Sequence, residues 1–379
     1  MPRQHRPRVE CGRNADGHNT MQNGEGDMNH TCIKSRGRAA ALAAAALLCV
    51  NAPVRAAGSV TFAGYGGDYQ KNIVKALIRP AADKNDVTLR TESHDGLATV
   101  RVQVSSGRPA WDIVQLGAEE CATGSAQGLF EKLDYKLINV DGIPATARAD
   151  DWIASNYYSV VLAYRTDKYK NNPPKTWADF WDVKKFPGRR ALALQPQETM
   201  EVALLGDGVS PDKLYPLDQK RALAALGRLK PDVAAWWTSG AQSAQLLRDG
   251  EVDMEAIWGS RIAPVIDSGA PVAFTFNQGL LAYACLAIPK GAKHVAEARK
   301  VIADVMTPPI QANIPEVMPF YGPVNMKAFD VRKFTTDVLA KANSSPRNRT
   351  MQVQMNGAYW GQNQNLQQGN EALRALISR

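Results

Sequence analysis

The stretch WWTSGAQSAQLLRDGEVDMEAIWGSR, residues 236–261, shows within a short length of chain the pattern that decides the fold. Its middle part predicts a helix near residues 243–249. That helix ends at Gly250, because glycine readily adopts the left-handed conformation found just after a helix. In the following EVDMEAIW, apolar and polar residues alternate as they do in a strand. The residues on the apolar face are Val252, Met254, Ala256 and Trp258.

The same alternation of elements continues along the chain in both directions. Further strands are predicted near residues 60–63, 86–91, 111–116, 157–167, 190–194, 232–236 and 283–291. Helices are predicted near residues 69–82, 97–105, 201–205, 219–229 and 295–306, and one more opens at a capping box of Thr176 and Asp179. This alternation, with glycine-rich turns from strand to helix, is typical of an α/β fold with a largely parallel sheet.

Residues 1–56 have the composition of a secretory signal peptide. An apolar run over residues 39–50 follows a basic flank and precedes a small-residue cleavage site near Ala56–Ala57. The run is shorter than the roughly 20 residues that span a membrane. Met28 offers a start that gives a signal of ordinary length, and Leu48 before Cys49 argues against a lipid anchor.

Charge and composition exclude several classes of function. The 379-residue chain has a net charge of +8, but without residues 1–56 it has 37 basic against 33 acidic residues, a net charge of +4. No basic stripe remains to indicate nucleic-acid binding. Cys121 and Cys285 remain, either as a disulfide, which an exported protein permits, or as two buried thiols. With only His94 and His294 left, a histidine-rich metal site is excluded, and we expect no metal and no cofactor.

Candidate ligand-binding residues stand at the carboxyl ends of predicted strands, where ligands of α/β proteins bind. The first loop, GYGGDY, is no dinucleotide fingerprint, since Tyr69 stands where the last glycine is required. The main chain around Tyr65, Gly66 and Gly67 could bind an anion. Asp68 either caps the next helix or faces a cationic ligand.

Two further loops are acidic. Glu119 and Glu120 follow the strand WDIVQL, either as a solvated helix start favoured by the helix dipole or as a negative wall for an amine. Glu198 and Thr199 lie in the loop of QPQETMEVALL. Glu201 lies one residue too far round the helix to point the same way as Glu198.

The last candidate loop lies at the end of residues 236–261. Trp258 is either a core side chain or a wall for the methylenes or cationic head of an amine. Gly259 lacks a side chain, which would free one face of the indole. Arg261 could pair with a ligand carboxylate through two hydrogen bonds, or with Glu255 or Asp267.

No motif of a catalytic serine, cysteine or zinc site occurs in the sequence. We therefore do not expect an enzyme. Because carboxylates are plentiful, a secreted hydrolase that uses a pair of acids in a cleft stays the alternative from another class.

With these features, the chain resembles the periplasmic solute-binding proteins of ABC importers, in the spermidine/putrescine-binding branch. Its most specific pieces are PPKTWADFWDVKKFPGRRAL, the opening stretch, LAIPKGAK and YGPVN, and the match spans nearly the whole chain after the signal. The resemblance implies a type II binding protein: two α/β lobes, each a mostly parallel central sheet flanked by helices, with the ligand cleft between them. We expect lobe 1 over residues 57–163 and 285–379, lobe 2 over 164–284, and hinge strands near 157–164 and 283–288.

The resemblance also implies roles for single residues. In polyamine-binding members, carboxylates hold the amino groups and aromatic side chains enclose the methylenes. In this chain, Glu119 and Glu120 stand at positions where the family often has tyrosines. The matching residues are Asp68 and Glu198 for the acids, Trp258 in WGS for the tryptophan of a W-N-G motif, and Tyr321 in FYGPVN for a further aromatic wall. Thr238, after the strand that Trp236 and Trp237 close, is expected near the cleft.

Two positions depart from the polyamine binders. Where these carry a tryptophan and an amine-binding aspartate, this chain has Ala282 and Ala284, with Tyr283 as the nearest aromatic residue. The missing charge-assisted contact, of about 1.5–3 kcal/mol, argues against a polyamine. The pair Tyr157–Tyr158 resembles that of ferric-ion binders, but it precedes a crossover strand rather than a second-lobe loop, which argues against iron.

We therefore predict a monomeric periplasmic protein that captures a small amine-bearing solute, polyamine-like or zwitterionic, and delivers it to an ABC permease in the inner membrane. One alternative keeps this fold and binds a carboxylate-bearing solute through Arg261 and the loop Gly64–Asp68.

Overall fold

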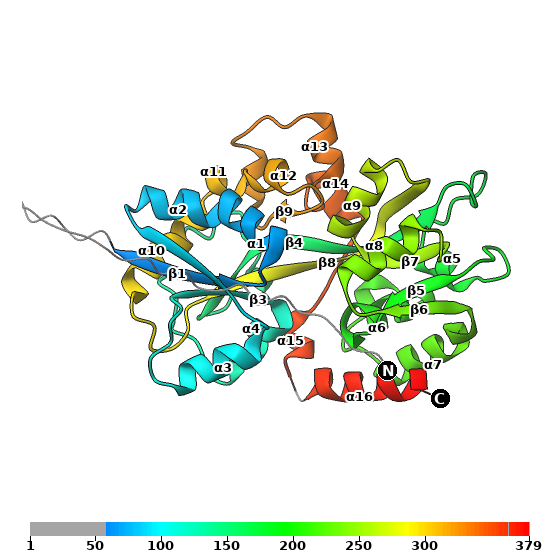
Figure 1. The fold of residues 1–379 in the computed structure, drawn as a ribbon, viewed down its shortest axis with the longest axis horizontal. Coiled ribbons are helices and arrows are strands. Elements are labelled where there is room, and N and C mark those ends of the chain that lie inside the picture. The colour runs from blue at the N-terminus through cyan, green and yellow to red at the C-terminus, as the bar shows by residue number, and fades with distance from the viewer. Residues whose placement is uncertain (1–57, 363, 379) are drawn as a thin grey trace, which may run out of the picture. The chain divides into compact units, whose positions relative to one another are not determined.

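The computed structural model describes residues 58–362 and 364–378 (Figure 1). The predicted signal peptide, its cleavage site and the start at Met28 lie outside these residues. Within the described ranges, no helix has both the length and the apolar character needed to cross a membrane.

A ten-stranded sheet forms the centre of the described part of the chain. Its order is β2-β1-β3-β8-β4-β7-β5-β6, with β10 beside β8 and β9 beside β4. The strands are β1 (Ser59–Gly64), β2 (Thr88–Ser93), β3 (Ile113–Gly117), β4 (Trp152–Arg165), β5 (Arg190–Ala193), β6 (Val233–Trp237), β7 (Met254–Trp258), β8 (Val272–Ala287), β9 (Gly322–Pro323) and β10 (Val353–Gln354).

Two parallel groups of three strands lie at the two ends of this sheet. β1 pairs with β2 and β3, and β5 pairs with β6 and β7, so the earliest strand is central in each group. The long strands β4 and β8 run antiparallel between the groups, as Figure 1 shows. The predicted α/β class with mostly parallel sheets is thus confirmed, and β8 begins earlier than the predicted strand at residue 283.

Helices cover both groups. They are α1 (Gly67–Ile73), a π-helical turn (Val74–Ile78), α2 (Arg79–Lys84), α3 (Leu97–Ser105), α4 (Ala118–Ala126), α5 (Trp177–Trp181), α6 (Pro196–Gly206), α7 (Gln219–Leu229), α8 (Gly240–Arg248), α9 (Gly259–Asp267), α10 (Val295–Val305), α11 (Pro308–Gln311), α12 (Ile314–Val317), α13 (Thr336–Lys341), α14 (Pro346–Thr350), α15 (Gly357–Trp360) and α16 (Asn365–Ser378). The capping box at α5 is confirmed, since Thr176 accepts the N–H of Asp179. The pattern did not predict α9, which starts directly after β7.

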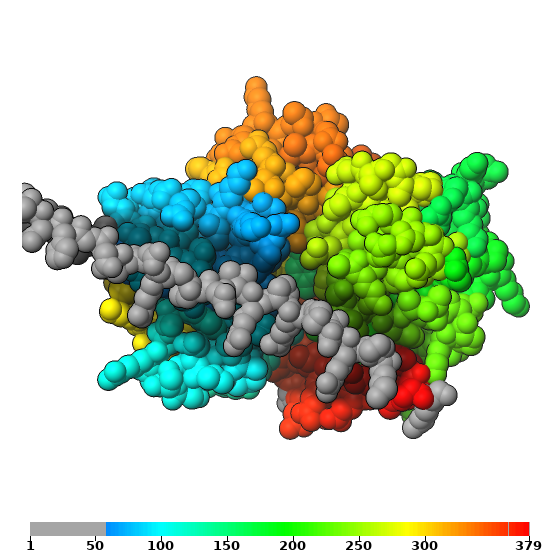
Figure 2. Space-filling view, in the orientation of Figure 1, coloured from blue at the N-terminus to red at the C-terminus, as the bar shows by residue number. Residues whose placement is uncertain are grey.

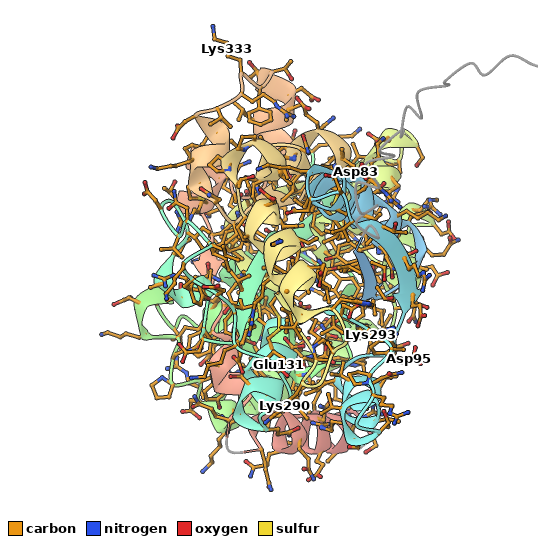
Figure 3. The ribbon with its side chains drawn as sticks, turned by 90° about the vertical axis from the view of Figure 1, so that its left-hand side faces the viewer. Asp83, Asp95, Glu131, Lys290, Lys293 and Lys333 are labelled. Atoms are coloured by element: carbon orange, nitrogen blue, oxygen red, sulfur yellow. A yellow bond between two sulfur atoms is a disulfide. The ribbon has the colours of Figure 1, made fainter. Side chains whose placement is uncertain are left out.

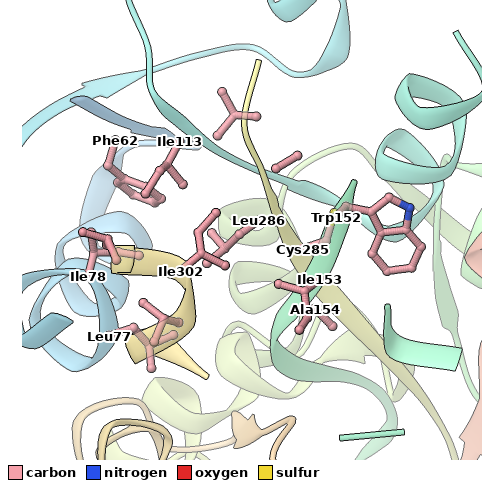
Figure 4. Close-up of a cluster of buried hydrophobic side chains, with 14 of the residues drawn as sticks. Phe62, Leu77, Ile78, Ile113, Trp152, Ile153, Ala154, Cys285, Leu286 and Ile302 are labelled. Carbon is pink, nitrogen blue, oxygen red and sulfur yellow. The ribbon is translucent and has the colours of Figure 1, made fainter. Parts of the chain in front are cut away.

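The apolar core divides in the same way as the sheet. One cluster of buried side chains packs around β1 and β3, and includes Phe62, Ile113 and Leu286 (Figure 4). Two further clusters contain neighbouring residues of β4, with Leu162 in one and Val161 in the other. Since successive residues of a strand point to opposite faces, these two clusters cover the two faces of the second strand group.

The C-terminal helix packs on the second strand group, although the sequence assigns it to the lobe of the first. α16, which the predicted lobe 1 includes, packs against α6 and α7 beside the second strand group (Figure 1). At Gly369 of α16, a Cβ atom would lie 2.8 Å from Cβ of Pro196, so only glycine allows this approach.

Cys121 of α4 and Cys285 of β8 form a disulfide, with their Cα atoms 6.6 Å apart. The sheet explains the pairing, because Leu116 of β3 lies opposite Cys285, and α4 starts immediately after β3. Of the two states that the sequence left open, the structure shows the disulfide.

Charged side chains lie mostly on the outside, where Asp83 and Lys333 project from the surface (Figure 3). Exposed ion pairs such as Lys132–Asp150 contribute about 0–1 kcal/mol each. The buried apolar clusters therefore account for most of the stability of this fold.

Candidate functional site

A cavity of about 460 Å³ lies at the carboxyl ends of strands from both parallel groups, β1 and β3 from the first and β5 and β7 from the second. Figure 2 shows the surface hollowed between the blue residues of the first group and the yellow-green residues of the second. β1 leads into Tyr65, β3 into Glu119, β5 into Gln195 and β7 into Ser260, and all four residues line the cavity. Each group thus contributes the carboxyl ends of its strands, which is where α/β proteins bind ligands.

The structure brings most of the predicted site residues together. Those that line the cavity are Tyr65, Gly66, Glu119, Glu120, Glu198, Trp258, Arg261 and Tyr321. Those that lie outside its lining are Gly67, Asp68, Thr199, Thr238 and Tyr283. Their role in binding a ligand stays a prediction, and the contacts below decide which of them face the cavity.

Asp68 lies outside the lining of the cavity. It lies in the first turn of α1 without capping the helix, and its exposed side chain pairs with Lys71 at 2.9 Å. Gly67 is the first residue of α1 and has a left-handed φ of 60°, so it serves the turn. The Asp68 carboxylate thus pairs outside the cavity lining in this structure, and its contact with a ligand stays a prediction.

Of the other three outlying residues, two are held by contacts elsewhere and one is exposed. The hydroxyl of Thr199 donates to the carbonyl of Ala193 at 2.9 Å, and that of Tyr283 donates to the carbonyl of Thr146 at 2.9 Å. Tyr283 also stacks on Trp152 in the core. Thr238 is exposed beyond the end of β6.

The two adjacent acids of α4 have different surroundings. Glu120 accepts the N–H of Leu97 at 2.8 Å with Oε1, and its Oε2 accepts the Tyr65 hydroxyl and the N–H of Gly117. Glu120 therefore caps α3 and orients the Tyr65 ring. Within the described ranges, the Glu119 carboxylate has a hydrogen bond only with its own backbone, and burial, followed by the charge of Glu120, raises the pKa of Glu119 to about 7. Glu119 is thus the acid that faces the cavity.

Glu198 is buried in the first turn of α6, where the helix is kinked, and has a left-handed φ of 73°. Its Oε2 accepts the side-chain amide of Gln195 at 2.7 Å and the indole N–H of Trp258 at 2.9 Å. Burial raises the pKa of Glu198 to about 8. A non-glycine residue in this conformation costs of order 1–3 kcal/mol, a strain typical of functional sites.

Trp258 forms a half-buried wall, with its ring edge-on to Trp237 at 5.0 Å between centroids. The predicted reason for the neighbouring glycine is wrong. A Cβ atom at Gly259 would lie 3.4 Å from Cβ of Phe320, an ordinary contact in the core. Gly259 therefore faces Phe320 and does not free the indole.

Arg261 supplies positive charge to the cavity lining from the first turn of α9. The absence of a side chain at Gly240 makes room for the Arg261 side chain, which packs directly over it. Neither of the two predicted internal pairings of Arg261 occurs in the described part of the chain, and both oxygens of Glu255 lack any partner there. The guanidinium group is thus placed to meet an anionic group in the cavity.

Several lining residues were not predicted. They are Tyr69, Gly117, Tyr158, Gln195, Gln197, Ser260 and Ala284. Tyr158 could have been predicted from the sequence, because successive side chains of a strand point to opposite faces. Tyr158 therefore points away from its neighbour Tyr157, which is buried. Ala284, one of the two departures from the polyamine binders, lies in the cavity wall. Over residues 58–362 and 364–378, no cluster of three metal-ligating side chains was found.

Comparison with known proteins agrees with this geometry. Residues 76–342 match the bacterial extracellular solute-binding proteins, and the chain belongs to this family. It is 34% identical over 275 residues to the gamma-aminobutyric acid-binding protein of Pseudomonas aeruginosa, covering 70% of this chain and 77% of that protein. It is 26% identical over 220 residues to the spermidine/putrescine-binding periplasmic protein 1 of Haemophilus influenzae, covering 54% of this chain and 58% of that protein.

A solved structure is also similar. The ABC transporter substrate-binding protein from Bradyrhizobium japonicum USDA 110 superposes with a TM-score of 0.80 at 41% identity, covering 84% of this chain and 99% of that one. The predicted resemblance to solute-binding proteins of ABC importers is confirmed. Members of this family bind small solutes for a membrane permease and are not enzymes.

Proposed function

We propose that this protein binds a small zwitterion of the kind of γ-aminobutyric acid and delivers it to the permease of an ABC importer. One observation carries the proposal: a single cavity is lined by the carboxylates of Glu119 and Glu198 and by the guanidinium of Arg261. A zwitterion carries the two complementary charges.

The acidic side of the cavity fits an ammonium group. Glu119 and Glu198 are each buried enough to raise the carboxyl pKa, and burial of a carboxylate without a cation is costly. A ligand ammonium would supply that cation. Tyr65, Tyr158 and Trp258 line the same cavity, and aromatic faces attract both methylenes and cations.

The basic side of the cavity fits a carboxylate. An arginine binds a carboxylate through two parallel hydrogen bonds, which fixes direction as well as charge. Ala284 in the wall supplies no acid for a second amino group. The higher identity to the γ-aminobutyric acid-binding relative than to the spermidine/putrescine-binding relative supports a zwitterion over a polyamine.

We further propose two lobes that close on the ligand about β4 and β8, in a monomer exported to the periplasm. The separate core clusters support the division at these strands. Because α16 packs on α6 and α7, we place α16 with lobe 2 and the remainder of residues 285–379 with lobe 1.

The test is calorimetry with the purified protein and four solutes: γ-aminobutyric acid, putrescine, spermidine and glutarate. The proposal expects the tightest binding for γ-aminobutyric acid. Tighter binding of glutarate would support the alternative in which Arg261 dominates, and tighter binding of putrescine or spermidine would show that Arg261 does not set specificity.

A further inference from the structure

We propose that Glu201, which does not line the cavity, is a positioning residue that sets affinity through Trp360. Glu201 joins α6, next to Glu198, to α15, which packs on α4 next to Glu119. The inference rests on the proposed binding of an ammonium group between Glu119 and Glu198.

The contact at Glu201 is buried and short. Oε1 of Glu201 accepts the indole N–H of Trp360 at 2.6 Å and the hydroxyl of Tyr215 at 2.7 Å, and Glu201 has no exposed surface. Oε2 is buried without a partner in the described residues. Two donors from different segments converge on this one oxygen, so the contact holds Trp360 against α6.

α15 in turn is pressed against α4. At Gly357, a Cβ atom would lie 2.5 Å from Cβ of Ala118, and at Gly361 it would lie 2.7 Å from Cβ of Ala122 and 3.1 Å from the carbonyl oxygen of Glu119. Such distances exclude any side chain at Gly357 and Gly361. The helix that carries Glu119 therefore has a fixed position relative to α15.

The same segment touches the turn that carries Glu198. Gly369 of α16 packs against Pro196, at the start of that turn, and its Cβ position lies 3.1 Å from Cζ3 of Trp360. α15 and α16 thus contact both acidic elements, although these follow strands of different groups, β3 and β5. The groups of a binding site must be held within a fraction of an ångström of their working positions. Supporting contacts of this kind hold them there.

The first experiment compares Trp360→Phe with the matched control Trp177→Phe in γ-aminobutyric acid binding and thermal unfolding. Both tryptophans are buried in the same core cluster, and Trp177 also donates one indole N–H, to the carbonyl of Gln278 at 2.8 Å. We expect similar losses of thermal stability, but affinity about tenfold weaker in Trp360→Phe, or about 1.4 kcal/mol, and changed less than about twofold in the control. Equal affinity losses, or none in Trp360→Phe, would overturn the inference.

The second experiment uses Glu201 itself. Glu201→Gln keeps an oxygen that accepts from Trp360 and Tyr215, so its affinity should stay within about threefold of the parent, whereas Glu201→Leu should lose about tenfold. The double variant Glu201→Leu with Trp360→Phe should lose no more than Glu201→Leu alone, because both changes break one contact. Additive losses, or equal losses in the two Glu201 variants, would contradict a positioning role.

Failure of this inference and failure of the proposed function can be told apart. If the parent protein binds none of the amine-bearing solutes, the proposed function fails. If the parent binds γ-aminobutyric acid and the variants bind it equally well, only the positioning role of Glu201 and Trp360 fails.

Discussion

Trp258 donates its indole N–H to Oε2 of Glu198 at 2.9 Å, which joins the end of β7 to the first turn of α6. The same oxygen accepts the amide of Gln195, so the Glu198 carboxylate is held from two sides while its backbone is left-handed. The tryptophan that the sequence offered as a stacking wall thus has a second role, which is to position an acid.

Trp258→Phe should weaken binding of γ-aminobutyric acid by about tenfold, because a hydrogen bond to a charged group contributes about 1.5–3 kcal/mol. The phenyl ring still packs on Trp237, so thermal stability should change little. Calorimetry and thermal unfolding measure both effects. If Trp258→Ala instead loses about 3–5 kcal/mol of stability, as a truncated core aromatic does, the indole belongs to the core.

Glu119→Gln and Glu120→Gln should have opposite consequences. Glu119→Gln removes an acid that faces the cavity, so affinity should fall while stability is kept or rises. Glu120→Gln weakens the cap on Leu97 and the contact to Tyr65, so stability should fall by about 1–2 kcal/mol. Chemical denaturation and calorimetry separate the two, and the reversed pattern would mean that Glu120 is the ligand-binding acid.

Arg261→Ala should weaken binding of γ-aminobutyric acid by at least about tenfold, since it removes a paired charged contact. Binding of n-butylamine, which lacks the carboxylate, should be unchanged. Arg261→Lys is the matched control, because it keeps the charge without the two-pronged geometry. Equal losses for both solutes in Arg261→Ala would mean that the arginine supports the fold of the site and not the ligand.

Stability and binding should depend on pH in opposite directions. Burial raises the pKa values of Glu119 and Glu201 to about 7 and that of Glu198 to about 8, from 4.5. The folded state therefore holds these protons more tightly than the unfolded state. Their contribution to stability is fully present below pH 4.5 and is lost as the pH rises through about 7 to 8.

Binding of an ammonium group needs the charged acids, so affinity should fall as the pH drops through the same range. Thermal unfolding with and without γ-aminobutyric acid, between about pH 5 and pH 9, tests both statements. The unfolding temperature without ligand should fall toward high pH, while the increase caused by ligand should grow. A ligand-free protein that gains stability between about pH 6 and pH 8 would show that these carboxyls are ionised at little cost.

Replacing Cys121 and Cys285 together with serine should lower the free energy of unfolding by about 2–4 kcal/mol, because the disulfide closes a long loop of the unfolded chain. Denaturation of the parent protein with and without a reducing agent provides the matched comparison. If the reducing agent destabilises the double variant as much as the parent, the effect lies outside this disulfide.

Much of the fold could be predicted because its signals are local. The helix over residues 97–105 and the strands at WDIVQL and EVDMEAIW follow from periodicity within a few residues, and the structure shows them at these places. α9 was missed because Pro264 interrupts its pattern and its start at Gly259 has no polar cap. The packing of α16 beside the second strand group was not predicted, because nothing in its own sequence specifies its partners, α6 and α7.

The sequence predicted those residues of the candidate site that directly follow the ends of strands. Glu119, Glu198, Trp258 and Arg261 follow the carboxyl ends of strands, which is where ligands of α/β proteins bind. Strand order alone does not bring them together, because β3 and β7 run in opposite directions in the sheet. Asp68 stands at a similar place, yet Lys71, one turn further along α1, pairs with its carboxylate outside the cavity.

The sequence by itself determined the α/β class, the strand ends and the acidic and aromatic character of their loops. These depend on spacing along the chain, which is visible in the residues. The tertiary structure alone decided that Glu120 caps α3 while Glu119 stays open, that Gly259 faces Phe320, and that Cys121 meets Cys285. The physical reason is that a side chain's partners come from segments far apart in sequence, and their approach depends on packing that no local pattern records.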